Sequence, residues 1–274
     1  MIMACMYSIN IRFKDVPISE KDTYISYLPA SHVFEQGLIS TSIIYGMKCG
    51  FFNGNPLKMI DDMSVLKPTF FATVPRILNR IYGKIMDKMA SAGGVKGWLA
   101  NKAIQTKLDN YKKGLGFKHS IYDALIFSKI QMLLGGNVRA IVTGSAPIDR
   151  NVLDLLKICF CCPIGEGYGL TETCASTCLS LMDDPESGVV GGPLVNVKLR
   201  LKDVPDMNYL STDMPPRGEV CVFSPCVMEG YFMNPEKTAE SFDGRWFKSG
   251  DVGQIEANGA LRIIDRAKNI FKLS

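Results

Sequence analysis

The densest group of residues able to do chemistry lies past the middle of the chain, in the run Gly165-Glu-Gly-Tyr-Gly-Leu-Thr-Glu172. Glycines at alternate positions let a backbone come close to a ligand and present its N–H groups. Tyr168 offers a flat face for a base, Thr171 a hydroxyl for a phosphate oxygen, and Glu172 a hard carboxylate for Mg²⁺. A glycine-rich turn without any ligand is an equally good explanation of the run taken alone. The run is not a Walker loop, because the chain contains no G-x-x-x-x-G-K-[ST].

Two charged segments nearer the C-terminus could extend such a site. The segment Trp246-Phe-Lys-Ser-Gly-Asp251 predicts a tight turn whose carboxylate can accept hydrogen bonds from two ribose hydroxyls. Turn formation by Gly-Asp alone explains this segment as well. Asp265-Arg-Ala-Lys268 carries charges of both signs, and a surface ion pair is its simplest explanation in isolation.

Helix and strand signals place the first group within an α/β region. Apolar residues recur at helical spacing in several segments, and glycine pairs end two of them. Val138–Val142 is short, apolar and β-branched, which predicts a strand, and the loop Thr143-Gly-Ser-Ala-Pro147 follows it. Ligands of such folds bind at the carboxyl ends of strands, so this loop is a candidate ligand contact. The expected helices cover residues 76–90, 98–111, 121–134 and 150–159.

The chain changes character after about residue 193. Residues 195–201 alternate between apolar and polar types, which is typical of a half-buried strand, and another strand is expected over 219–223. Asn258-Gly259 between two apolar runs predicts a hairpin. We therefore predict an α/β fold in which residues 1–193 form α/β layers and residues 194–264 form a β-rich subdomain.

Composition narrows the class of protein. Hydrophobic residues make up 47% of the 274 residues and the net charge is +4, which excludes a disordered chain. No apolar run is long enough for a membrane-spanning helix, and the N-terminus lacks the features of a signal peptide. Nine cysteines, an odd number, favour reduced thiols in a protein that faces the cytosol.

Basic residues concentrate between Arg76 and Lys118, where ten lysines and arginines stand against two acids. An anionic membrane surface or a polyphosphate ligand would match this charge, and a solvated helical face would match it equally well. Nucleic acid is not expected as a partner, because aromatic residues are not interleaved as stacking platforms.

The order of the motifs resembles that of the adenylate-forming (acyl-CoA synthetase/luciferase) superfamily. Within it the chain is similar to long-chain fatty acyl-CoA synthetases from about Tyr24 onward, and a basic helical insert over 76–118 and Glu166 in place of glutamine support this. The remaining motifs that carry the resemblance are 28–35, 73–80, 143–147, 166–172, 218–222, 246–251 and 264–273.

The resemblance implies that the chain binds ATP and Mg²⁺. Thr171 would contact the α-phosphate and Glu172 would hold the metal, so both are catalytic candidates. His32 lies at a position near the acyl carboxylate in that family and is the third catalytic candidate, with a core histidine as the alternative. The residues expected around adenine, ribose and phosphate are Gly144, Ser145, Ala146, Pro147, Glu166, Gly167, Tyr168, Gly169, Leu170, Thr171, Asp251 and Arg266.

The same resemblance implies that enzymes of this family have further parts, which these motifs do not cover. Lys268, within 265–274, would be the hinge to a C-terminal domain that the sequence lacks, together with its catalytic lysine. The phosphate loop expected before His32 is also missing. We therefore expect the chain to be part of a longer enzyme and to be inactive by itself.

The expected activity of that enzyme is ATP-dependent conversion of a long-chain fatty acid to an acyl-adenylate and then to acyl-CoA, with CoA as co-substrate. A same-fold ligase for shorter or aromatic acids and a non-catalytic nucleotide- or lipid-binding protein are the alternatives. The expected location is the cytoplasm or the cytosolic face of an intracellular membrane, which residues 76–118 would contact.

Overall fold

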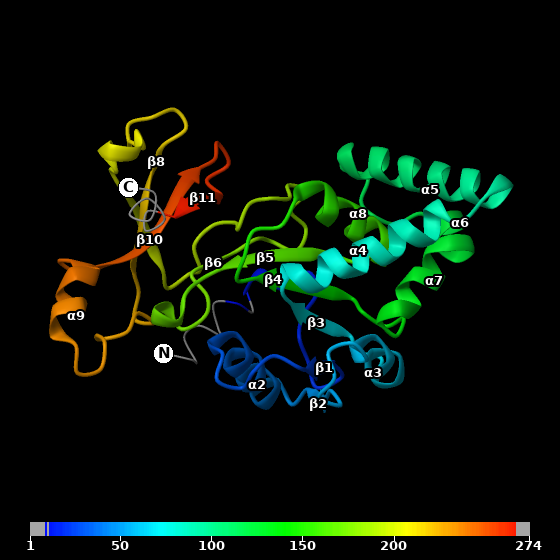
Figure 1. Cartoon of the computed structure of the whole chain (residues 1–274), viewed down its shortest axis with the longest axis horizontal. Coiled ribbons are helices and arrows are strands. Elements are labelled where there is room, and N and C mark those ends of the chain that lie inside the picture. The colour runs from blue at the N-terminus through cyan, green and yellow to red at the C-terminus, as the bar shows by residue number, and fades with distance from the viewer. Residues whose placement is uncertain (1–8, 10, 267–274) are drawn as a thin grey trace. The chain divides into compact units, whose positions relative to one another are not determined.

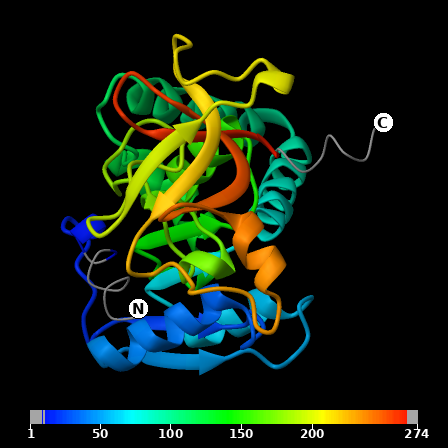
Figure 2. The same cartoon turned by 90° about the vertical axis from the view of Figure 1, so that its left-hand side faces the viewer.

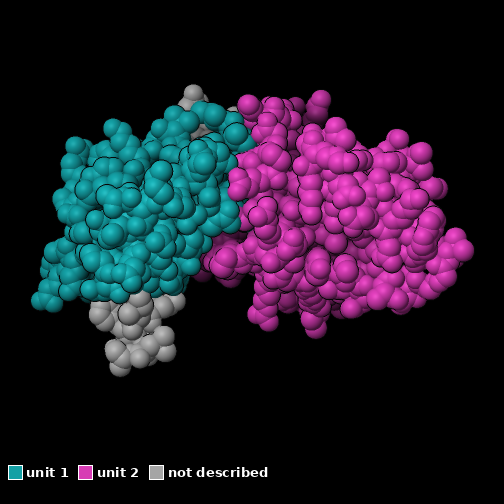
Figure 3. Space-filling view, turned by 90° about the horizontal axis from the view of Figure 1, so that it is seen from above, with its two compact units in different colours: residues 1–12, 166–181, 189–274 teal, residues 13–165, 182–188 magenta. Residues whose placement is uncertain are grey.

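A computed structural model of the chain describes residue 9 and residues 11–266 (Figure 1). Contacts divide the chain into two compact units, which Figure 3 distinguishes by colour. The α/β unit comprises residues 13–165 and 182–188, and the β-rich unit comprises the described residues of 1–12, 166–181 and 189–274. The division into domains at residue 193 stays a prediction.

The α/β unit is built on a sheet of strands in the order β2-β1-β3-β4-β5. Strands β1, β2, β3 and β4 run parallel to their neighbours in this order, and every residue of β3 is buried. Helices connect them, as parallel pairing requires. The strands are β1 (Thr23–Ser26), β2 (Lys48–Phe51), β3 (Phe70–Thr73), β4 (Ala140–Gly144) and β5 (Ile164–Tyr168), of which β5 continues into the β-rich unit.

Apolar helix faces close the core of this unit. Helix α8 (Arg150–Phe160), the last helix of this unit, has buried residues throughout its final turns. Asp149 caps its start by accepting hydrogen bonds from the backbone N–H groups of Asn151 and Val152. The helices are α2 (Val33–Tyr45), α3 (Met59–Leu66), α4 (Pro75–Ala90), α5 (Gly94–Lys112), α6 (Ser120–Tyr122), the π-helical η1 (Asp123–Phe127), α7 (Ser128–Gln131), the 3-10 turn η2 (Met132–Leu134) and α8 (Arg150–Phe160).

The helices expected over 76–90, 98–111 and 150–159 are confirmed as α4, α5 and α8. The segment 121–134 is helical but not one regular helix, because a π-helical turn interrupts it over 123–127. The glycine that ends it, Gly135, has a φ of 84°, the left-handed conformation that glycine adopts without steric cost.

The β-rich unit holds an antiparallel sheet in the order β11-β10-β8-β7, with β9 paired beside β10 (Figure 2). A short strand, β6, pairs antiparallel with the end of β5. The elements are η3 (Thr171–Thr173), β6 (Cys178–Leu179), β7 (Lys198–Lys202), η4 (Pro205–Met207), β8 (Arg217–Phe223), α9 (Pro235–Ser241), β9 (Phe242–Asp243), β10 (Trp246–Ile255) and β11 (Leu261–Arg266).

The predicted hairpin at Asn258-Gly259 is confirmed, since β10 and β11 pair on either side of it and Gly259 has a φ of 82°. The tight turn predicted at 246–251 is wrong. This segment lies inside β10, where the pairing with β8 shifts register between Lys248 and Val252 and Gly250 has a φ of 74°. Some β-bulges place a glycine at a positive φ, as some tight turns do, so the two can look alike in sequence.

No helix among residues 9 and 11–266 is long and apolar enough to cross a membrane. The cysteines within the same range form no disulfide.

Candidate nucleotide-binding site

The β-rich unit brings together three of the side chains expected to bind the nucleotide. The Tyr168 hydroxyl donates to Asp251 Oδ2 at 2.9 Å, and Arg266 Nε donates to Asp251 Oδ1 at 3.1 Å. The Asp251 residue is only 6% exposed, whereas the Arg266 side chain is 68% exposed. A carboxylate offers about four acceptor positions, so Asp251 retains capacity for further donors such as ribose hydroxyls.

Strand register explains why these groups meet. Asp251 lies directly opposite Arg266 in the antiparallel pairing of β10 with β11, where side chains of opposite charge stabilise each other. The bulge in β10 fixes the backbone, because the Asp251 N–H donates to Ser249 Oγ at 3.1 Å and the Gly250 N–H donates to Glu219 Oε1 at 3.0 Å. Asp251 is therefore held from both sides before any ligand binds.

The surroundings keep Tyr168 protonated. Burial raises the pKa of Tyr168 well above its ordinary value of 10.0, and the negative charge of Asp251 raises it further. The phenol therefore remains a hydrogen-bond donor across the neutral range, and its ring position depends on the Asp251 carboxylate.

The glycine-rich run has a packing role of its own. A Cβ atom at Gly169 would come within 2.0 Å of the Ala175 carbonyl oxygen, so only glycine fits where the chain folds back on itself. Gly167 lies within the β5–β6 pairing, opposite Leu179. Residues 164–168 form strand β5, so the alternative of a glycine-rich turn is wrong for this part of the run.

Glu172 lies on the 3-10 turn η3, immediately after Thr171, whose side chain is exposed. Its Oε1 atom accepts a hydrogen bond from the Tyr231 hydroxyl at 2.8 Å, and its backbone oxygen accepts from the Met228 N–H at 2.8 Å. Sequence reasoning missed Tyr231, because no local pattern marks which distant hydroxyl will meet a carboxylate.

A magnesium ion would fit at Glu172 only with phosphate oxygens as further ligands. No cluster of three or more histidine, cysteine or acidic side chains suited to a metal occurs in the described part of the chain. Mg²⁺ in nucleotide sites is commonly held by one or two carboxylates together with substrate phosphates and water. A single half-buried carboxylate whose other oxygen accepts no hydrogen bond from the described residues agrees with that kind of site.

His32 and the loop Gly144–Pro147, which are expected site residues as well, belong to the α/β unit, whereas Glu166 and Leu170 belong to the β-rich unit. His32 caps the start of α2, where its Nδ1 atom accepts from the Phe34 N–H at 3.2 Å. Its side chain is exposed, so the alternative of a core histidine is wrong. Ser145, Ala146 and Pro147 are exposed at the carboxyl end of β4, and Ser145 has a φ of 72°, which is unusual for a residue other than glycine.

These two sets of residues lie in different units, and their joint contribution to one site stays a prediction. Lys268, the expected hinge residue, lies outside the described residues, as does the rest of 267–274.

Comparison with known proteins gives the family. Residues 1–232 match the family model described as AMP-binding enzyme. The chain is 41% identical over 260 residues to Long chain acyl-CoA synthetase 5 of Arabidopsis thaliana, covering 94% of this chain and 39% of that protein. It is 42% identical over 254 residues to Long-chain-fatty-acid--CoA ligase 1 of Homo sapiens, covering 92% of this chain and 36% of that protein. The chain thus spans less than half the length of these relatives.

Solved structures agree with the fold expected from the sequence. The A domain of carboxylic acid reductase from Segniliparus rugosus, in complex with AMP and a co-purified carboxylic acid, matches with a TM-score of 0.68 and 27% identity, covering 90% of this chain and 35% of that one. O-succinylbenzoate Coenzyme A Synthetase from Bacillus subtilis, in complex with ATP and magnesium ion, has the same fold, with a TM-score of 0.65, 18% identity and coverage of 97% and 46%. The α/β fold class is confirmed.

Proposed function

Because the chain belongs to the AMP-binding enzyme family, we propose that it supplies adenosine- and metal-binding groups to an enzyme that activates long-chain fatty acids with ATP. The observation that carries this proposal is the buried Asp251 carboxylate, which Tyr168 and Arg266 hold by hydrogen bonds. The substrates and the activity are those of the protein that contains this chain, and its homology to long-chain acyl-CoA synthetases supports them.

The proposed reaction has two steps. The fatty acid carboxylate attacks the α-phosphorus of ATP and displaces pyrophosphate, which gives the acyl-adenylate. The thiol of CoA then attacks the acyl carbonyl, loses its proton and expels AMP. No protein nucleophile is needed, so catalysis in the first step consists mainly of positioning and charge stabilisation.

The residues of the β-rich unit have distinct roles in this proposal. Asp251 accepts hydrogen bonds from the ribose hydroxyls, Arg266 faces the ribose and phosphate, and the Tyr168 ring stacks on adenine. Thr171, exposed beside Glu172, donates to an α-phosphate oxygen. A magnesium ion held by Glu172 would neutralise charge that develops on the phosphates.

The α/β unit would supply contacts to the fatty acid and to adenine. His32 is proposed to face the fatty acid carboxylate, and its exposed ring at the start of α2 is available for this. The Gly144–Pro147 loop is proposed to contact adenine, which agrees with its place at the carboxyl end of a parallel strand.

The test is ATP–pyrophosphate exchange with Glu172→Gln in the protein that contains this chain. Losing one preorganised charge-stabilising group typically lowers turnover by about 10²–10³-fold, so we expect a large loss that raised Mg²⁺ or Mn²⁺ partly restores. Asp206→Asn, which changes an exposed acid of the same unit, is the control. Wild-type exchange by Glu172→Gln at ordinary Mg²⁺ would contradict the metal role.

The same assay separates the alternatives. Exchange that is strongest with shorter or aromatic acids would identify a same-fold ligase with another acyl pocket. ATP binding without exchange for any acid would identify a non-catalytic nucleotide-binding protein. Exchange that is strongest with acids of long chain would support the proposal.

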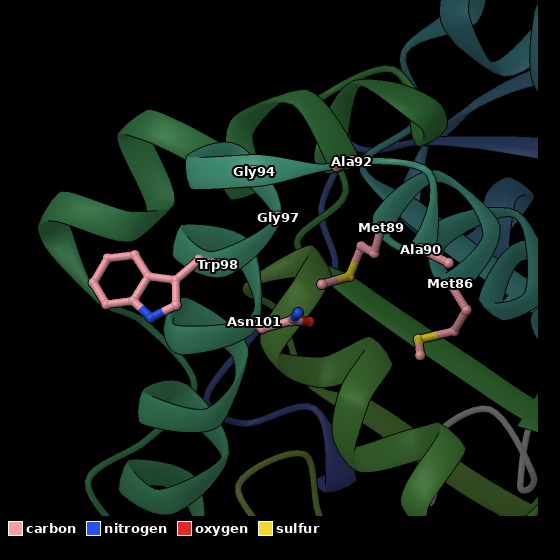
Figure 4. Close-up of a pocket in the computed structure, with 8 residues that line it drawn as sticks. All are labelled: Met86, Met89, Ala90, Ala92, Gly94, Gly97, Trp98 and Asn101. Atoms are coloured by element: carbon pink, nitrogen blue, oxygen red, sulfur yellow. The ribbon is translucent and has the colours of Figure 1, made fainter.

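A second part of the proposal concerns the basic segment 76–118. Nine of its ten lysines and arginines are exposed, and Val95 and Trp98 are 80% and 61% exposed beside them. A cavity of about 350 Å³ opens near Trp98, lined mostly by small residues and methionines (Figure 4). Cationic charge around exposed apolar side chains is complementary to an anionic lipid surface, which we propose as the partner.

Charge reversal tests the membrane contact. Lys112→Glu with Lys113→Glu should weaken binding to vesicles that contain phosphatidylserine, since each basic residue near such a surface contributes about 1 kcal/mol. Lys58→Glu with Lys67→Glu, two exposed lysines outside the segment, is the matched control. Vesicle binding that responds neither to the reversal nor to added salt would contradict the proposed contact.

A further inference from the structure

Glu172 is held by a segment that lies far from it in the sequence. Besides the Tyr231 hydroxyl on Oε1, the Met228 N–H donates to the Glu172 backbone oxygen, so residues 228–231 fix both the main chain and the carboxylate of this residue. None of the ion pairs within the described residues involves Glu172. Among the described residues, its carboxylate is therefore stabilised by one neutral side-chain donor, and no cation pairs with it.

Tyr231 is itself fixed by helix α9. Its backbone N–H donates to Thr238 Oγ1 at 2.9 Å, and its carbonyl oxygen accepts from the Asn234 N–H at 3.1 Å. The Lys237 ammonium lies 4.6 Å from the centre of its ring, a distance at which a cation attracts an aromatic face. The tyrosine therefore depends on the first turns of α9 for its position.

The residue before Tyr231 permits this close packing. A Cβ atom at Gly230 would lie 2.7 Å from Thr238 Cγ2 and 2.9 Å from Thr238 Oγ1. Thr238 thus fits against the backbone at Gly230 only because that residue has no side chain, and the same hydroxyl then reaches the Tyr231 N–H. The contacts form a continuous chain from α9 to the Glu172 carboxylate.

We propose that Tyr231 is a positioning residue for the metal-binding carboxylate of Glu172. Its hydroxyl occupies Oε1 and leaves Oε2 available to a metal, and it adds no positive charge that would compete with that metal. This inference rests on the proposed metal role of Glu172. Hydrogen-bond partners of metal ligands orient them in this way, and their loss typically lowers metal affinity by about 10–100-fold.

The test measures ATP affinity with Mn²⁺ and without it, in EDTA, by equilibrium binding to the protein that contains this chain. The ratio of the two affinities isolates the contribution of the metal. Tyr231→Phe should lower this ratio about tenfold, at the lower end of the range for such partners. Tyr209→Phe removes a tyrosine hydroxyl that forms no hydrogen bond with the described residues, so it should keep the wild-type ratio.

Two further variants separate this inference from the proposed function. Glu172→Gln should lower the ratio more than Tyr231→Phe, and the double variant should match Glu172→Gln, because Tyr231 acts through Glu172. A lowered ratio for Glu172→Gln with an unchanged ratio for Tyr231→Phe would overturn the inference and leave the metal role standing. An additive loss in the double variant would also overturn it. An unchanged ratio for Glu172→Gln would overturn the metal role and the inference together.

Discussion

The two units each hold a charged side chain away from full solvent, and they do so in opposite ways. Lys107 in the α/β unit is 1% exposed, and its ammonium contacts Asp123 Oδ1 at 2.5 Å, the Ile158 carbonyl oxygen at 2.6 Å and Cys161 Sγ at 3.1 Å. Glu172 in the β-rich unit is half-buried, and its carboxylate accepts one hydrogen bond from a neutral phenol.

The difference separates a structural charge from a charge that we propose is kept for a ligand. An ammonium with three donors, all of them used, has no capacity for another partner, and its positive charge is cancelled by Asp123. A carboxylate held through one oxygen by an uncharged group keeps both its charge and its second oxygen. A charged group whose hydrogen bonds are all made and whose charge is balanced by an opposite charge therefore indicates a role in the fold. A charged group that is held in one orientation with no opposite charge beside it indicates a role in binding a ligand.

The largest effect expected from this comparison is on stability. Lys107→Met leaves Asp123 without its cation in a partly buried position, and breaking such a pair typically costs about 3–5 kcal/mol. Lys102→Met, at an exposed position of the same helix, should change the free energy of unfolding by less than about 0.5 kcal/mol. Urea unfolding of the two variants measures the difference in stability. Equal stabilities would contradict the structural role of Lys107.

Lys107 also marks where sequence reasoning reaches its limit. Ten basic residues between 76 and 118 look alike in sequence, and local spacing correctly predicts helices α4 and α5 that carry most of them. Spacing cannot tell which lysine meets an acid from a later segment. The partner Asp123 lies in the π-helical turn η1, which the sequence signals only as helix.

The next effect concerns the nucleotide. Asp251→Ala in the protein that contains this chain should weaken ATP binding by about 10–100-fold, because hydrogen bonds to a charged group are worth roughly 1.5–3 kcal/mol. The ribose does not react, so the Michaelis constant for ATP should rise more than turnover falls. Asp213→Ala, which removes a partly buried acid that pairs with Arg217 in the same unit, is the control. An unchanged Michaelis constant for Asp251→Ala would remove Asp251 from the proposed site.

The order of the motifs along the sequence predicted more of this site than the interpretation of each motif by itself did. Tyr168, Asp251 and Arg266 were expected to act together from the resemblance, and the register of β10 with β11 and the hydrogen bonds of Asp251 bring them together. Their use in nucleotide binding stays a prediction. The local interpretation of Asp251 as part of a tight turn failed, because strand pairing over long separations decides between a turn and a bulge.

A smaller effect distinguishes the carboxylate from its phenol partner. Tyr168→Phe keeps the ring for stacking and removes only the donor to Asp251 Oδ2, while Arg266 still holds Oδ1. A loss of about 1 kcal/mol, or roughly fivefold in ATP affinity, is expected. Tyr209→Phe is the matched control. A loss as large as that of Asp251→Ala would show that the phenol itself, and not the carboxylate, contributes most of the affinity.

The smallest effect is on the pH dependence of stability. It concerns only that part of the contribution of the Lys107–Asp123 pair to stability that changes when Asp123 takes up a proton. Burial alone would raise the pKa of Asp123, but its hydrogen bonds from Lys107 and from the His119 N–H and the charge of Lys107 hold this pKa below the ordinary value of 3.8. A carboxyl group with a lowered pKa in the folded state stabilises the fold above the unfolded-state pKa and loses this contribution as the pH falls through the folded-state pKa.

The stability difference between the wild type and Asp123→Asn should therefore be constant above about pH 5 and should shrink on acidification below 3.8. Asp243→Asn is the contrasting variant, since Asp243 pairs with Lys202 and Arg200 at the surface, where salt screens the interaction. Urea unfolding at several pH values, at low and high salt, measures both. The Asp123 difference should resist salt because Lys107 is buried, and a salt dependence equal to that of Asp243 would place both pairs in the same class of surface ion pair.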